Sequence, residues 1–286
     1  PPMRGASIVP ALQWSGGLLA IHLVLSRAAQ RAGGDVGADP HLAAHFPVAL
    51  FSFLTLAVVG TMKWLSEAPD DRLHGYSEDG LFIARFMLAF QLYELLVTLF
   101  ERRLAGPGGI MVLHHTLVVL LSGWVVTHQY MHYYCIFFFG VPEISSVPLA
   151  FVDLFKQIPT LRARFPTVNE VARNTFAAAF IFVRIFWFSR VSLHFWQDSL
   201  IEYQAQTSLQ SKAFVITVCL VNLVMLALQY YWGSLIAKVC PHVIVASPKQ
   251  RTVIYLACFL SPMAHSILLF QALYKLATGD PSHKDA

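Results

Sequence analysis

Two adjacent histidines, His114 and His115, lie within an otherwise apolar stretch that runs from 110 to 127. A neutral imidazole is tolerated in an apolar cavity and titrates near neutral pH, so such a pair can act as a general base or a nucleophile. A purely structural, hydrogen-bonding role is the alternative. Neighbouring side chains on a helix point about 100° apart, which does not suit two ligands of one metal ion. The chain also has no HExxH pattern, so we expect no metal site here.

Few other polar side chains interrupt the apolar stretches, and such residues at membrane depth usually face a cavity or a partner helix. Pro142 predicts a helix kink directly before Glu143. This kink either is purely structural or lines an internal cavity. We expect Glu94, Arg184 or both to pair across the bundle, with Glu143 as a candidate partner. Asn222 and Gln229 share a helix face, which favours hydrogen bonds between helices. The candidate cavity-lining residues are Glu94, Glu143, Ser145, Ser146, Arg184 and Asn222.

The composition is that of an integral membrane protein. Hydrophobic residues make up 56% of the 286 residues and charged residues only 13%, and the mean hydropathy is +0.58. Soluble domains carry about 25% charged residues. No run of lysine and arginine occurs, so we expect membrane lipids as partners and no nucleic acid.

The apolar stretches predict an all-α, polytopic bundle of transmembrane helices, because a spanning helix needs about 20 mostly apolar residues. A further stretch at the N-terminus, 7–26, is weaker and either spans or lies in the interface. The six strong spans are 46–65, 80–100, 110–127, 133–152, 174–196 and 213–237, and an additional C-terminal span is expected at 252–277.

The basic residues of the connecting segments predict the orientation. Eleven lysines and arginines fall on the side that holds 27–45, and six fall on the other side if 7–26 spans. Because basic residues are enriched in cytoplasmic loops, we expect 27–45 and 156–173 to share the cytosolic side, or the matrix or stromal side of an organelle.

Four short sequences, in this order along the chain, resemble the TLC-domain family. This family groups the translocating-chain-associating membrane protein, the longevity-assurance ceramide synthases and lipid-homeostasis relatives. The resemblance spans about 46–238 and rests on His114-His115-Thr-Leu, Pro142-Glu143-Ile-Ser145-Ser-Val-Pro148, the stretch from Asn174 to Arg184-Ile, and Val221-Asn222 with Tyr231-Trp232.

The resemblance implies a six-helix core around a cavity for long acyl chains. His114 and His115 match the double histidine that the ceramide synthases use in acyl transfer from acyl-CoA to a sphingoid base. The synthases' upstream aspartates are missing, and the segment from Pro142 to Pro148 is closer to the non-synthase, lipid-homeostasis branch. The expected organisation is an N-terminal segment (1–45), a TLC-like domain (46–238) and a C-terminal span with a short tail (239–286).

The leading hypothesis is therefore a multi-pass membrane protein that binds or handles acyl lipids. We expect no cofactor, although a bound phospholipid or acyl lipid fits the resemblance. Two alternatives stay open: a non-catalytic accessory subunit of a large membrane complex, bound to other membrane proteins, and an acyl-CoA-dependent acyltransferase of ceramide synthase type. The resemblance implies the endoplasmic reticulum, and an inner membrane of an organelle is the alternative.

Overall fold

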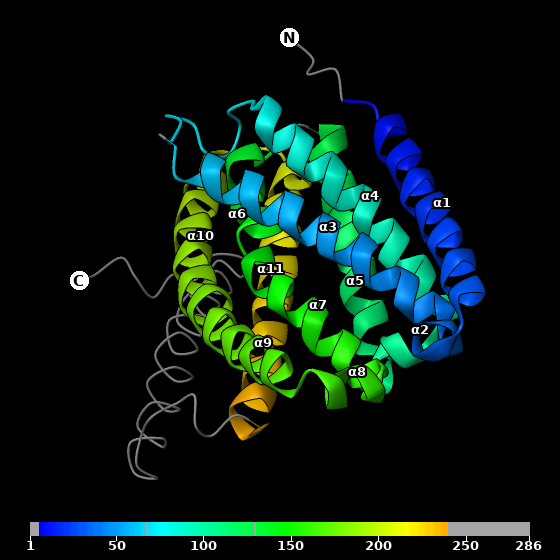
Figure 1. Cartoon of the computed structure of the whole chain (residues 1–286). Helices are drawn as coiled ribbons and strands as arrows, with labels where there is room; N and C mark the ends of the chain where they lie inside the picture. Colours follow the sequence, from blue (N-terminus) through cyan, green and yellow to red (C-terminus); the bar gives the residue numbers. More distant parts are fainter. Residues whose placement is uncertain (1–5, 67, 129, 240–286) are drawn as a thin grey trace, which may run out of the picture.

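The computed structural model describes residues 6–66, 68–128 and 130–239, and within these ranges the regular elements are all helical (Figure 1). The elements are α1 (Val9–Ala32), α2 (Gly34–Ala38), α3 (Pro40–Trp64), α4 (Glu78–Phe100), η1 (Arg102–Ala105), η2 (Pro107–Gly109), α5 (Ile110–His128), α6 (His132–Gly140), α7 (Glu143–Gln157), α8 (Pro159–Arg164), α9 (Pro166–Ala179), η3 (Phe180–Trp187), α10 (Phe188–Ala205) and α11 (Leu209–Val239).

Seven helical segments of the described chain are long and apolar enough to cross a membrane, which confirms the all-α polytopic bundle. The first of them is α1, so the weak N-terminal stretch forms a helix of spanning length. Two segments exceed their predicted spans most: α6 and α7 together cover His132–Gln157, and α9 to α10 cover Pro166–Ala205. The additional span expected at 252–277 lies outside the described residues.

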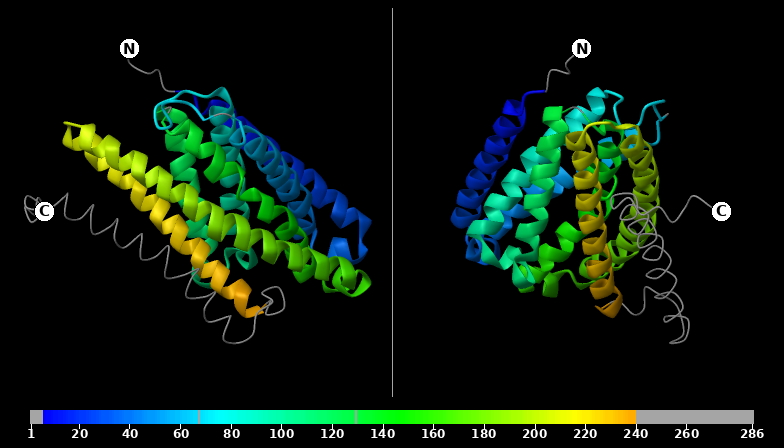
Figure 2. Two further views of the ribbon diagram at one scale, coloured as in Figure 1. Left: turned by 90° about the vertical axis from the view of Figure 1, so that its left-hand side faces the viewer. Right: turned by 180° about the vertical axis from the view of Figure 1, so that it is seen from behind.

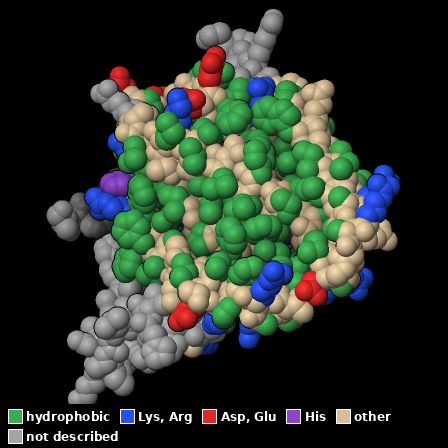
Figure 3. Space-filling view, in the orientation of Figure 1, with side chains coloured by type: hydrophobic (Ala, Val, Ile, Leu, Met, Phe, Trp, Pro, Cys, Tyr) green, Lys and Arg blue, Asp and Glu red, His purple; other side chains and the backbone are tan. Residues whose placement is uncertain are grey.

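The outer surface is as apolar as a lipid-facing surface must be. Large hydrophobic side chains are exposed on several spans, among them Phe51, Met62, Leu120 and Phe182. In the face shown in Figure 3, hydrophobic side chains cover the middle and charged side chains lie around the rim. An apolar surface that covers several helices would promote aggregation in water, whereas the hydrocarbon of a bilayer solvates it.

The spans pack in an order that leaves α4 and the α6–α7 pair as the most buried segments. α1 packs on α3 and α4, α5 packs on α4, and α3 crosses both α6 and α7. α10 runs alongside α11, as both views of Figure 2 show. The buried polar side chains of α4 and α7, among them Gln91, Glu94 and Glu143, therefore face other helices instead of lipid.

Two glycines bring α3 and α6 into direct backbone contact. A Cβ atom on Gly60 would lie 2.5 Å from the Cα atom of Gly140, and one on Gly140 would lie 2.6 Å from the Cα atom of Gly60. Small residues allow such close approach between membrane helices. This contact fixes α3 against the chain at the point where α6 ends and the Val141-Pro142 turn leads into α7.

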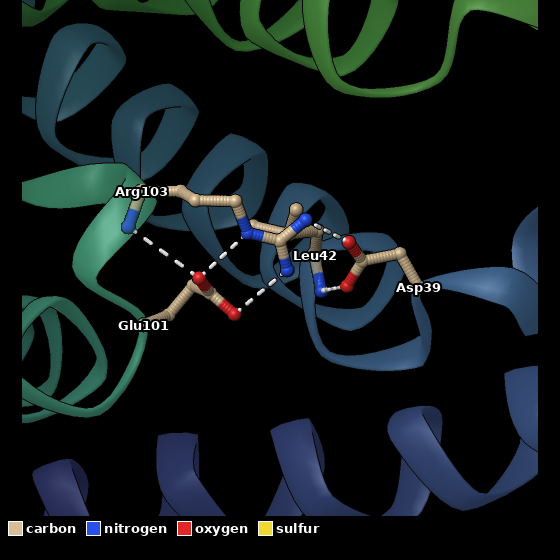
Figure 4. Close-up of polar contacts among 4 residues, drawn as sticks. All are labelled: Asp39, Leu42, Glu101 and Arg103. Carbon is tan, nitrogen blue, oxygen red and sulfur yellow. Dashed lines mark hydrogen bonds and ion pairs between the residues drawn. The ribbon is translucent and has the colours of Figure 1, made fainter.

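A network of charges holds the opposite end of α3 (Figure 4). The Arg103 guanidinium donates to Glu101 at 2.7 and 2.9 Å and to Asp39 at 2.5 Å. Asp39 also caps α3 by accepting from the Leu42 amide. The hydrogen bonds from Arg103 lower the pKa of the Glu101 carboxyl. The segment between α4 and α5 is thereby tied to the start of α3.

The loops predicted to share one side of the membrane lie at one end of the bundle. α2, in the 27–45 segment, and α8, in the 156–173 segment, are found together at the lower right of Figure 1, and both views of Figure 2 agree. The Asp39–Arg103 contact places the loop before α5 at the same end. A common end of the bundle is what a shared side of the membrane requires, and the sharing of that side stays a prediction.

Candidate functional site

An internal cavity lies among α4, α5, α6, η3 and α11. About 40 Å³ of it is open to the centres of water molecules, which is room for a few waters or one small polar group. Its wall is mostly apolar and contains a few polar side chains. The lining residues are Met87, Gln91, His114, Leu117, Val118, Leu121, Met131, Phe138, Phe139, Pro142, Glu143, Arg184, Phe188, Val218, Asn222, Met225 and Gln229.

Arg184 is the charged centre of the cavity wall. It belongs to η3, a π-helical stretch between α9 and α10, and such stretches are frequent at functional sites. Its guanidinium donates to Ser145 and Ser146 at 2.8 Å each and to Gln229 at 3.4 Å. It also pairs with the Glu143 carboxylate at 3.3 Å.

The Glu143–Arg184 pair is buried on both sides, with 8% and 9% of the two residues exposed. A lone charge at this depth costs several kcal/mol, and an opposite charge with further hydrogen bonds offsets that cost. Glu143 is in place because α7 begins with it, directly after the Pro142 turn. The predicted kink thus positions the Glu143 carboxylate at the cavity, where this carboxylate neutralises Arg184.

Two buried polar atoms in the cavity wall have no hydrogen-bond partner among the described residues: Nδ1 of His114 and Oδ1 of Asn222. Both residues line the cavity. The His114 ring also lies edge-on to Trp232, with ring centroids 5.3 Å apart. Buried polar groups are nearly always paired, so two such atoms at one cavity indicate a place where a polar ligand or water binds.

The two adjacent histidines face different surroundings. His114 lines the cavity, whereas the Nδ1 atom of His115 lies 2.6 Å from Oε1 of Gln91. Nε2 of His115 lies 4.0 Å from the Glu94 carboxylate. The rotation of a helix by about 100° per residue produces this division. The structure therefore gives His115 a hydrogen-bonded position and leaves His114 free to meet a ligand.

A second polar cluster lies behind His115, between α1, α3 and α4. Glu94 pairs with Nε2 of His45 at 2.9 Å, and the Tyr93 hydroxyl bonds Nδ1 of His22 at 2.9 Å. Of these residues, only Glu94 is among the candidates that the sequence predicts. The available signal was the presence of His22 inside an apolar stretch and of His45 one residue before a predicted span.

The candidate residues from the sequence divide between these two places. His114, Glu143, Arg184 and Asn222 line the cavity. Ser145 and Ser146 do not, because their hydroxyls turn to the Arg184 guanidinium from the first turn of α7. Glu94 and Arg184 both pair across the bundle, as expected, but with different partners. The acid that meets Arg184 is Glu143, and Glu94 meets His45.

No group of three or more His, Cys, Asp and Glu side chains within the described ranges has the arrangement of a metal site. The described lining offers hydrogen bonding by an imidazole, three amides and a neutralised arginine. Such a set recognises polar groups or exchanges protons with them.

Comparison with known families assigns the helical core. The family model for the TLC domain matches residues 41–238, which is more than half of the chain. A search of curated proteins and of solved structures finds no significant match. The matched region starts at α3, ends at α11 and contains every residue of the cavity wall. The chain belongs to the TLC-domain family.

Proposed function

We propose that the protein binds an acyl lipid whose polar group occupies the cavity beside His114 and Asn222. The observation that supports this proposal is the pair of buried, unpartnered polar atoms on these two side chains, set in an otherwise apolar wall. Ligand sites combine a mostly apolar lining with a few polar groups that fix orientation. The surrounding bilayer supplies lipids as the ligands at highest concentration.

The charge of the wall indicates the kind of polar group. Arg184 is already neutralised by Glu143, so the cavity offers no unpaired cation for a free carboxylate or phosphate. The Asn222 carboxamide accepts through Oδ1 and the His114 imidazole either donates or accepts, depending on its tautomer. A neutral group with a donor, such as a hydroxyl or an amide N–H, fits these partners best.

The acyl chain of such a lipid would leave the cavity between α5 and α11. These two helices pack mainly on other partners, α4 and α10 respectively. The seam between them is closed by aromatic contacts, Trp232 on His114 and Trp124 stacked on Phe214 at 4.9 Å. Side-chain rotation there would open a lateral path from the polar group to the bilayer.

Native mass spectrometry of the purified protein tests this function. We expect a lipid of defined mass to stay bound to the wild type, and we expect Asn222→Leu to lose most of it. Ser52→Ala is the control, because its hydroxyl bonds the Val48 carbonyl inside α3 and does not line the cavity. Equal lipid content in all three proteins would contradict the proposal, and stoichiometric protein partners without lipid would favour the accessory-subunit alternative.

A second function, acyl transfer with His114 as the base, is favoured by the free Nδ1 atom of His114 in the cavity. A base of this kind is usually oriented by a carboxylate on its other nitrogen. Among the described residues no carboxylate contacts His114, and the nearby Glu94 meets His45 and His115 instead. Lipid binding therefore remains the leading function, and the resemblance favours the endoplasmic reticulum as its place, which fluorescence microscopy of a tagged chain would test.

A further inference from the structure

We propose that Glu94 is a proton relay between His45, near the membrane surface, and His115, directly behind the cavity. Chains of histidine and acidic side chains at membrane depth are the usual route for protons through helical bundles. The proposal concerns the cluster between α3, α4 and α5 and does not depend on which ligand the cavity holds.

The geometry of Glu94 connects two helices through its two carboxylate oxygens. Oε1 lies 2.9 Å from Nε2 of His45 on α3, and Oε2 lies 4.0 Å from Nε2 of His115 on α5. The first contact is a hydrogen bond. The second is closed by a small rotation of the carboxyl group or by one water molecule. Each imidazole therefore presents a ring nitrogen to the same acid.

The outer end of this path reaches the surface. The side chain of His45 is 17% exposed, whereas that of His115 is 7% exposed. His45 lies in the second turn of α3, next to the end of the bundle that holds Asp39 and Arg103. That end carries the loops that the basic residues predict on the cytosolic, matrix or stromal side, and the proposal has solvent protons enter at His45 from there.

The inner end of the path stops at the cavity wall. Nδ1 of His115 faces Oε1 of Gln91 at 2.6 Å, and this contact requires the imidazole to donate from Nδ1. Nε2 is then the basic nitrogen, and it is the one that faces Glu94. Gln91 and His114 both line the cavity. A proton on His115 thus places a positive charge one side chain away from the ligand position.

The transfer balances in two steps. A protonated His45 gives its Nε2 proton to Oε1 of Glu94, which leaves a neutral imidazole and a neutral carboxylic acid. After rotation the carboxylic acid gives the proton to Nε2 of His115, which leaves the carboxylate and an imidazolium. Solvent protonates His45 again, so the net change is one proton moved from the surface to His115, and the reverse sequence discharges it.

Other titratable groups surround the relay on every side. On α1, His22 bonds the Tyr93 hydroxyl, and the Tyr93 ring stacks on His45 with centroids 6.1 Å apart. From α7, Asp153 acts electrostatically on His45, and Lys156 acts on Asp153.

The exchange of the His115 ring proton with solvent measures the relay directly. Nitrogen-15 labelling of the histidines, with the protein in lipid nanodiscs, gives this rate by nuclear magnetic resonance. We expect His45→Gln to slow the exchange by about tenfold or more, because the route through Glu94 loses its proton donor. The control is His128→Gln, which changes an exposed histidine that neither touches Glu94 nor lines the cavity.

Glu94→Gln is the second variant, since it keeps the shape and a hydrogen bond to His45 but removes the titrating group. We expect the same loss of exchange, with the fold checked by the melting temperature. A merely structural network would lower the melting temperature and leave the exchange rate of His115 within about twofold of the wild type. That outcome in His45→Gln or Glu94→Gln would overturn the proposal, whatever the lipid content of the protein.

Discussion

Arg184 explains why one part of the otherwise apolar cavity wall is polar. A guanidinium inside a membrane bundle needs a counter-charge and acceptors, and Glu143, Ser145 and Ser146 supply both within 3.3 Å. The adjacent histidines then take separate positions, one at the cavity and one in the hydrogen-bonded cluster. The chemistry of the site therefore depends on a few individual side chains, each of which has its own hydrogen-bond partners or position.

The first prediction concerns the Glu143–Arg184 pair. We expect Arg184→Gln to lower the free energy of unfolding by about 3–5 kcal/mol, because it leaves a buried carboxylate without its cation. Adding Glu143→Gln should restore part of the loss, since both buried charges are then gone. Unfolding in mixed detergent micelles measures both variants. Equal destabilisation in the single and double variants would show that the pair does not interact energetically.

The second prediction separates the two histidines. We expect His115→Ala to fold and keep its bound lipid, at a cost of about 1–3 kcal/mol for the lost Gln91 partner. His114→Ala should lower the lipid content while the protein stays folded. We also expect no acyl-CoA-dependent formation of ceramide by the purified protein. Acyl transfer to a sphingoid base that either substitution abolishes would replace lipid binding by catalysis as the function.

At the scale of elements, the α3–α6 contact and the Pro142 turn position the site. The Gly60–Gly140 approach fixes α6, the turn then redirects the chain, and α7 starts with Glu143. On the other side, Gly233 of α11 approaches η3 closely: a Cβ atom there would lie 2.8 Å from Cδ1 of Ile185. The cavity is therefore bounded by helices that meet through glycines.

The third prediction tests this packing. We expect Gly140→Ala to destabilise the protein by about 1–3 kcal/mol, because its new methyl group would meet the backbone of Gly60 and the helices must separate. Gly17→Ala is the matched control. No atom lies within 4 Å of a Cβ atom there, and alanine is the better helix former, so stability should stay equal or rise slightly. A neutral Gly140→Ala would show that α3 and α6 are not held at this distance.

At the scale of the whole molecule, the sequence predicts the class of fold and part of the site. Runs of apolar residues predict spans well, because their length is set by the bilayer. The Gly140–Pro142 kink and the residues Glu143, Arg184 and Asn222 are visible in the same way, since polar residues stand out in an apolar segment.

The choice of partners is not visible in the sequence. Either acid, Glu94 or Glu143, could pair with Arg184, and only the packing of α3 against α4 brings His45 to Glu94. Which of the two histidines faces the cavity and which faces Gln91 likewise depends on the neighbouring helices. A single sequence contains no signal for contacts between such distant positions.

The fourth prediction concerns orientation. Single cysteines at Gly34 and Arg164, in a background without native cysteines, should react with a membrane-impermeant reagent from the cytosolic side. A cysteine at Asp70, in the segment between α3 and α4, should react only from the opposite side. These expectations follow from the placement of α2 and α8 at one end of the bundle. Labelling of Gly34 and Arg164 positions from different sides would refute the arrangement.

Photo-crosslinking tests most directly whether a lipid places its polar group in the cavity. A lipid with a photoactivatable group beside its polar head is incorporated into the membrane, and the labelled residues are mapped by mass spectrometry. We expect adducts on cavity residues such as Leu117, Leu121 and Met225, and their loss in Asn222→Leu. Adducts confined to the outward faces, at residues such as Phe51, Leu120 and Phe182, would contradict the account.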